Sequence, residues 1–173
     1  MIRRHVALAA AAAGMLAGCS SEVPKTPISP AVADAGKVDM CAILTDAELT
    51  KLGIELKTRK QTDMLGLIGC HWQGEHLTLD LQRDRDTVAS YKARQPDPAF
   101  TTFAENTVNG RAGVRFSVDP DRTDCTQLID GGSVSLWIAV APAFSLDGPK
   151  INSCTEALRI AQLIEPRLPK PGE

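Results

Sequence analysis

The sequence predicts an α+β fold: a mainly antiparallel β-sheet packed against N- and C-terminal helices, an α/β sandwich cross-linked by two disulfides. Two hairpin signals, Asn109-Gly110 and Gly131-Gly132, lie between strand-like segments and predict antiparallel pairing. Two capping boxes, which begin at Thr45 and Ser153, predict a helix near each end of the domain. A chain of 173 residues is long enough for one such domain.

The first half of the domain is expected to have the order α-β-β-β-α. Gly53 ends the first helix, and a turn region at 61–66 separates the first two strands. In the third strand Leu77, Leu79 and Leu81 alternate with polar residues, which indicates one buried and one wet face. The expected elements are a helix within 41–53, strands at 54–59, 67–73 and 76–83, and a helix at 86–94.

The second half is expected to contain four strands and a final helix. Pro96 and Pro98 end the preceding helix, and the two hairpin signals join the strands in pairs. Apolar residues recur at helical spacing after Ser153 and form the stripe that would cover the sheet. The expected strands are 101–108, 111–118, 125–130 and 133–141.

The N-terminus has the pattern of a bacterial lipoprotein signal peptide. A basic start at 2–5 precedes twelve apolar or small residues at 6–17, too few to span a bilayer as a helix. The run ends in Leu16-Ala17-Gly18-Cys19, a lipobox. Diacylglyceryl and N-acyl groups on Cys19 would supply more than the two anchoring chains that stable membrane attachment needs.

The sequence therefore divides into a signal peptide (1–18), a lipidated tether (19–37), one globular domain (38–169) and a disordered tail (170–173). Prolines at three-residue intervals favour an extended tether. Removal of the signal deletes Arg3 and Arg4, which leaves 17 basic against 21 acidic residues, a net charge of −4. This acidic balance and the seven aromatic residues argue against nucleic acid as a partner.

The other four cysteines are an even number in an exported chain, which predicts two disulfides. Three pairings are possible, and the interpretation preferred from the sequence joins Cys41 to Cys154 and Cys70 to Cys125. A metal site made of these thiols with His71 and His76 is the competing hypothesis. The absence of any Cys-x-x-Cys pair in the sequence argues against it.

The sequence offers few candidates for catalysis. His71 follows Cys70 directly, but neighbouring strand residues point to opposite faces and a disulfide would consume the thiol. No Gly-x-Ser-x-Gly motif occurs, and no histidine lies in the C-terminal half. We therefore expect a protein that is not an enzyme, without a catalytic residue, metal or cofactor.

Two groups of carboxylates keep an enzymatic alternative open. Asp80, Asp84 and Asp86 could form a glycosidase pair or a cation site, although Asp84 and Asp86 more simply form a solvated turn before a helix. The loop at 119–124 contains Asp119, Asp121 and Asp124 and could bind calcium, but it lacks the glycine and final glutamate of an EF-hand.

The arrangement of these motifs resembles a known family. Cys41 in a helix-opening segment, Cys70-His-Trp72, Asn109-Gly110-Arg111, Cys125 in a strand and Cys154-Thr-Glu-Ala follow a lipobox in the same order as in the actinobacterial lipoproteins catalogued as domain of unknown function 3558. The resemblance covers nearly the whole mature chain. It implies lipoprotein processing and disulfides, and it brings no activity.

These observations predict a lipid-anchored protein on the extracytoplasmic face of the cell membrane. We expect a non-enzymatic binding or accessory module of the bacterial envelope, whose partner is an envelope protein or a small ligand. The alternatives are a hydrolase or cation-dependent enzyme that uses Asp80, Asp119, Asp121 and Asp124, and a carrier of a small apolar ligand. A carrier needs a cavity larger than about 300 Å³ under the sheet.

Overall fold

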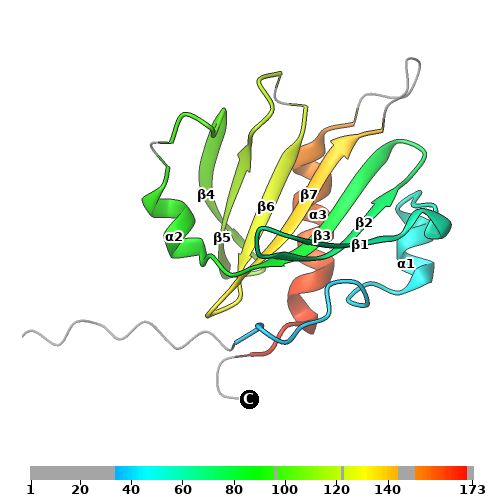
Figure 1. The fold of residues 1–173 in the computed structure, drawn as a ribbon, viewed down its shortest axis with the longest axis horizontal. Coiled ribbons are helices and arrows are strands. Elements are labelled where there is room, and N and C mark those ends of the chain that lie inside the picture. Colours follow the sequence, from blue (N-terminus) through cyan, green and yellow to red (C-terminus); the bar gives the residue numbers. More distant parts are fainter. Residues whose placement is uncertain (1–33, 96, 122, 144–150, 171–173) are drawn as a thin grey trace, which may run out of the picture.

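A seven-stranded antiparallel sheet forms the centre of the molecule, and helices pack on both of its faces (Figure 1). The structure is a computed structural model that describes residues 34–95, 97–121, 123–143 and 151–170. The strand order is β1-β2-β3-β7-β6-β5-β4. The elements are α1 (Asp46–Lys51), η1 (Leu56–Thr58), β1 (Lys60–Met64), β2 (Leu67–Gln73), β3 (Leu77–Asp84), α2 (Val88–Ala93), β4 (Thr102–Val108), β5 (Arg111–Ser117), β6 (Cys125–Asp130), β7 (Ser135–Pro142), α3 (Ser153–Ile164) and η2 (Glu165–Arg167).

The main core lies between the sheet and α3, which crosses β6 and β7. Leu77, Leu79 and Leu81 point into this core, as their alternation in the sequence predicts. The apolar stripe of α3 meets them from the other side through Ala157, Ile160, Ala161 and Ile164, all fully buried. Burial of about ten large aliphatic side chains here is the main source of stability.

The opposite face carries a second, aromatic core beneath α2. Tyr91 stacks on Phe116 with ring centroids 5.5 Å apart, and Phe100, Phe103 and Trp137 complete the cluster. The hydroxyl of Tyr91 donates to the buried carboxylate of Asp84. Burial, followed by this carboxylate, raises the pKa of Tyr91 well above its usual range. α2 packs mainly on β5 and β6, and none of the helices that the structure describes packs on β1 and β2 from this side.

Most of the expected elements are confirmed, including the Asn109-Gly110 hairpin and the Thr45–Glu48 capping box. The expected strand at 54–59 is wrong: Ile54 makes an isolated bridge to Gly74, and a short 3-10 helix follows. β1 instead occupies the expected turn region, because a two-residue turn at Leu65-Gly66 pairs Met64 with Leu67. The first helix is shorter than expected.

The N-cap of the last helix lies one residue earlier than predicted. Asn152 is the N-cap and accepts from the amide of Thr155, whereas the Ser153 hydroxyl donates to the carbonyl of Thr123. Asn and Ser are equally good N-caps, so the sequence could not choose between neighbours.

The two disulfides are confirmed, but the preferred pairing is wrong. The bridges are Cys41–Cys70 and Cys125–Cys154, with Cα atoms 5.1 and 4.9 Å apart. Cys70 lies on β2 and Cys125 on β6, with β3 and β7 between them. Three steps of about 4.8 Å put these strands about 14 Å apart, twice the distance that a disulfide can bridge. Cys154 reaches Cys125 because the start of α3 lies over the start of β6.

The chain enters the fold through a segment of irregular structure and turns, 34–41, that we call the strap. Ala35 is fully buried and its amide donates to the carbonyl of Gly131. The folded part thus includes residues 34–37, which the sequence had assigned to the tether. At the other end, Arg167 pairs with Glu48 of α1, and Arg111 bonds Glu165 and the carbonyl of Pro169. Among the described residues no helix has the length and apolar character needed to cross a membrane.

Each bridge closes a loop of 29 residues in sequence separation. Replacement of both cysteines of one bridge by alanine should lower the free energy of unfolding by about 3 kcal/mol, because the unfolded chain regains the entropy of that loop. Urea denaturation of the oxidised variants measures this loss. Peptide mapping without reduction should show Cys41 joined to Cys70; a Cys41–Cys154 peptide would contradict the fold described here.

Candidate functional site

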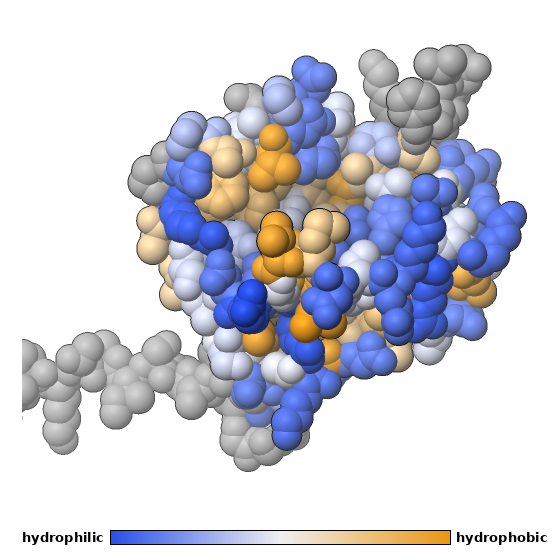
Figure 2. All heavy atoms as spheres, viewed as in Figure 1, coloured by the Kyte–Doolittle hydropathy of each residue, from blue (hydrophilic) through white to orange (hydrophobic). Residues whose placement is uncertain are grey.

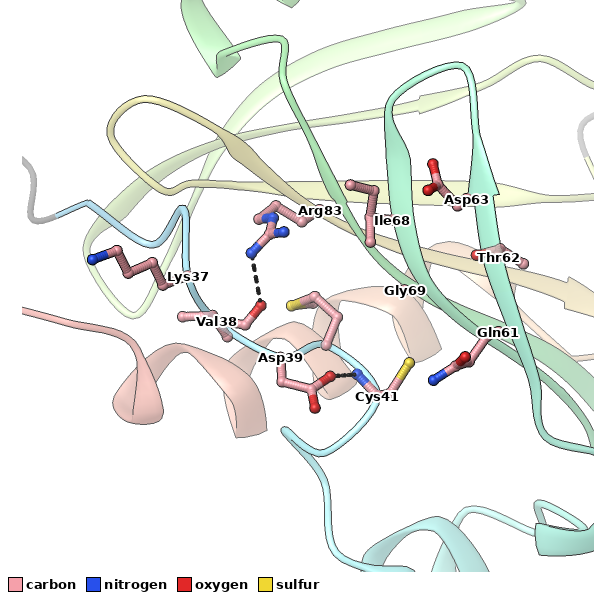
Figure 3. Close-up of a pocket in the computed structure, with 11 residues that line it drawn as sticks. Lys37, Val38, Asp39, Cys41, Gln61, Thr62, Asp63, Ile68, Gly69 and Arg83 are labelled. Carbon is pink, nitrogen blue, oxygen red and sulfur yellow. Dashed lines mark hydrogen bonds between the residues drawn. The ribbon is translucent and has the colours of Figure 1, made fainter.

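A pocket lies between the strap and the β1–β2 hairpin at one edge of the sheet (Figure 3). Its volume is about 480 Å³, which is within the range of small-molecule sites. The strap forms one wall, β1 the other, and β2 with Arg83 of β3 forms the floor. The lining residues are Lys37, Val38, Asp39, Met40, Cys41, Gln61, Thr62, Asp63, Ile68, Gly69 and Arg83.

Three interactions hold the strap wall in place. The Cys41–Cys70 disulfide ties the end of the strap to β2. Arg83 Nη1 donates to the carbonyl oxygen of Val38 at 3.3 Å, and the Asp39 carboxylate accepts from the amide of Cys41 at 2.9 Å. The pocket is therefore preformed by a covalent bond and two polar contacts.

The floor depends on a glycine. A Cβ atom added to Gly69 would lie 2.0 Å from the carbonyl oxygen of Leu81 on the neighbouring strand, a distance at which the backbone must move. Any larger residue at position 69 would push the two strands apart.

The lining combines charged and apolar groups. Lys37 and Arg83 supply two cations, and neither takes part in an ion pair within the described part of the chain. Asp39 and Asp63 supply two carboxylates, while Val38, Met40 and Ile68 supply apolar surface. This arrangement can bind a small molecule through charge and apolar contact together. The lining pairs no nucleophile with a histidine base.

His71 and Asp80 meet on the opposite, open face of the sheet. They are cross-strand neighbours on β2 and β3, and His71 Nδ1 lies 3.1 Å from Asp80 Oδ1. Burial raises the pKa of Asp80, and the attraction of His71 opposes this shift. Cys70, in contrast, points into the core and is bonded to Cys41. The adjacent Cys70 and His71 therefore lie on opposite faces, as expected.

The aspartates of the 119–124 loop bond the loop itself. The Asp119 carboxylate accepts from the amides of Asp121 and Thr123, and the Asp124 carboxylate accepts from the amide of Asp119 and the hydroxyl of Ser117. Hydrogen bonds from Thr123 and Asp121 lower the pKa of Asp119. Within the described ranges no group of three or more His, Cys, Asp or Glu residues could hold a metal ion.

The remaining predicted residues are dispersed. His76 Nε2 lies 3.6 Å from Glu75 Oε1 on the surface, just before β3. The expected solvated turn at Asp84 is wrong, because Asp84 is buried against Tyr91 and the cap of α2 is Thr87. Asp86 pairs with Arg94. Cys19 and the lipobox lie outside the described residues.

Sequence reasoning missed the pocket entirely. Lys37 and Asp39 fall in a stretch that was assigned partly to the tether, and Arg83 lies in an alternating strand without a motif. Glycine in the middle of a strand was the available signal, since Gly69 within 67–73 indicates a close backbone approach. The sequence does not show which segment lies over that glycine.

The fold and the pocket define a disulfide-linked α+β domain with a preformed cavity at the edge of its sheet. The chain belongs to the family described as "Protein of unknown function (DUF3558)", whose model matches residues 14–167. This finding confirms the resemblance seen in the sequence. No curated protein and no solved structure matches the chain.

The raised pKa of Asp80 gives a prediction with a definite sign. A carboxyl group whose pKa is higher in the folded than in the unfolded state contributes stability below its unfolded pKa and loses it as pH rises. Ionised Asp80 therefore costs stability at neutral pH. Asp80→Asn should raise the free energy of unfolding at pH 7, and the gain should shrink towards pH 3.

Urea denaturation at pH 7, 5 and 3 measures this dependence. The matched control is Asp63→Asn, which replaces an exposed aspartate on the neighbouring hairpin and should change stability little. A variant Asp80→Asn that is less stable than the wild type at pH 7, with a loss that shrinks towards pH 3, would show that the ionised carboxylate stabilises the fold and would contradict this prediction.

Proposed function

We propose that this protein is a membrane-anchored extracytoplasmic lipoprotein that binds a small amphiphilic ligand or an envelope partner and is not an enzyme. The observation that carries the proposal is the preformed pocket, which offers two cations free of ion pairs among the described residues beside apolar side chains. The disulfides support an oxidising compartment. The residues matched by the family model include the lipobox at 16–19.

The ligand class follows from the composition of the lining. An anionic head, such as a carboxylate or phosphate, would lie between Lys37 and Arg83, and a short apolar part would contact Val38 and Ile68. A carrier of a purely apolar ligand fits less well. The space between the sheet and α3 is filled by the main core, and the pocket lies outside it with a charged lining.

The anchor makes a prediction at Cys19. In the producing cell the mature chain should begin at Cys19, carry a diacylglyceryl group and sediment with membranes. Cys19→Ala should leave the signal peptide attached and abolish the acylation, because no thiol remains to accept the lipid. Mass spectrometry of the N-terminal peptide measures both. A mature N-terminus at another residue would contradict the anchor. It would not affect the binding proposal, which has a separate test.

The binding site makes a prediction at Arg83. In a screen of small carboxylates and phosphates bearing short alkyl chains, ligands should shift the amide NMR signals of the strap and of 61–63. Arg83→Met keeps the aliphatic stem and removes the guanidinium, so it should weaken such ligands about tenfold or more, the value of a charge-assisted hydrogen bond. Titration followed by NMR measures the change in affinity.

The matched control is Arg115→Met, which removes an exposed arginine from β5, outside the pocket. It should leave affinity unchanged. A ligand whose affinity falls equally in both variants would bind through general charge and not in this pocket. If no compound shifts the strap or the β1 signals, the pocket is not the binding site.

A further inference from the structure

The turn between β1 and β2 exposes apolar side chains to an unusual degree. Met64 is 66% exposed, Leu65 92% and Ile68 43%. We call these three residues the apolar tip. In Figure 2 apolar side chains stand out over this region of the molecule, beside strongly hydrophilic ones. Three exposed large apolar side chains within five residues of one hairpin exceed the scatter of single exposed residues that any surface carries. Met64 and Leu65 lie at the turn, whereas Ile68 lies on β2 on the pocket side.

The backbone of the turn makes leucine a poor choice at its centre. Leu65 has φ +55° and Gly66 φ +93°, which is the pattern of a two-residue type I′ turn. The other hairpin of the chain has nearly the same geometry, with φ +49° and +89°, and uses the favoured pair Asn109-Gly110. Left-handed φ is strained for leucine and easy for asparagine. Leucine at position 65 is therefore unfavourable in two ways: its apolar side chain is exposed to water, and its backbone is left-handed.

One cationic side chain contacts the turn of the apolar tip, and two more lie in the pocket at the base of the hairpin. A Cβ atom added to Gly66 would lie 2.6 Å from Arg85 Nε, so this guanidinium packs directly against the turn. Arg83 and Lys37 line the pocket at the base of the same hairpin. Asp63 and Asp39 lie there too, which leaves an excess of one positive charge on a chain that is acidic overall. Arg85 is the cation that lies at the turn itself.

The chain enters the fold close to this place. Lys37, three residues after the first described residue, shares the pocket with Asp63 and Ile68 of the hairpin. The proposed lipid on Cys19 would be separated from Asp34 by 14 residues, which span at most about 50 Å. The tether can thus let the hairpin reach the leaflet that holds the lipid.

We propose that the apolar tip inserts into the headgroup layer of an anionic lipid membrane, with Arg85 against the lipid phosphates. Apolar side chains flanked by cations suit this boundary, where both kinds of group find partners. A protein partner fits less well, since stable protein interfaces use about 20–30 residues on each side. The orientation of the domain on the membrane rests on the proposed anchor at Cys19. The affinity of the apolar tip for lipid does not depend on that anchor.

The test uses the oxidised, unacylated chain from Ser20 onward, which retains every described contact because all of them lie within 34–170. Co-sedimentation with vesicles of phosphatidylglycerol and phosphatidylcholine in equal parts measures binding. Leu65→Asn should weaken it tenfold or more, the effect of one large apolar side chain no longer buried. Arg85→Gln should weaken it about fivefold, and pure phosphatidylcholine should bind less than the mixture.

Folding is monitored separately, because asparagine suits the left-handed position. Leu65→Asn should melt at or above the wild-type temperature while it loses lipid binding. The control Leu163→Gln removes an exposed leucine from α3 and should bind as the wild type does. Absence of wild-type binding, or equal binding by Leu65→Asn, overturns the proposal. So does a concentration-dependent dimer that Leu65→Asn abolishes, since the tip would then contact a second copy.

Because the chain in this test carries no lipid, its result is independent of Cys19. Acylation at Cys19 without vesicle binding would leave the anchored lipoprotein intact and remove only the membrane-facing tip. Vesicle binding without acylation would retain the tip and remove the anchor.

Discussion

The Cys41–Cys70 bridge is the constraint on which the functional surface depends. The strap has no place in the sheet and makes few backbone hydrogen bonds, so chain entropy favours its release. The bridge fixes its end over β2, and the contacts of Val38 and Asp39 then become local. With the strap in place, the edge of the sheet becomes a preformed pocket and the direction in which the chain leaves is set. Preformed sites lose less conformational entropy when a ligand binds.

The elements that local signals specify were the ones the sequence predicted. The alternation of Leu77, Leu79 and Leu81, the pair Asn109-Gly110 and the capping box at Thr45 each depend on a few neighbouring residues. The prediction placed the strand before Leu65-Gly66 at 54–59 instead of 60–64. Leucine is rare in turns, so the sequence did not mark this two-residue turn. Such an exception to local preference is where function is to be sought.

The disulfide pairing and the pocket depended on information that no local pattern contains. Pairing follows from strand order, and β7 lies between β3 and β6 only because the chain returns to the centre of the sheet late. The pocket needs the strap, β1 and β3 together, three segments separated by up to 46 positions between Lys37 and Arg83. That the four cysteines form two disulfides was predicted correctly, because an even number of cysteines in an exported chain is enough for that prediction.

The covalent tie at Cys41 also has a mechanical meaning. Tension applied at the start of the strap acts first on its hydrogen bond from Ala35 to Gly131 and on the contact of Asp34 with Ser133. These can separate and release the seven residues before Cys41, which span at most about 25 Å when fully extended. Beyond that point the load passes through sulfur into β2 in the interior of the domain. The strap is therefore an extensible segment of fixed maximum length, and the core behind Cys41 is protected from being pulled apart from its N-terminal end.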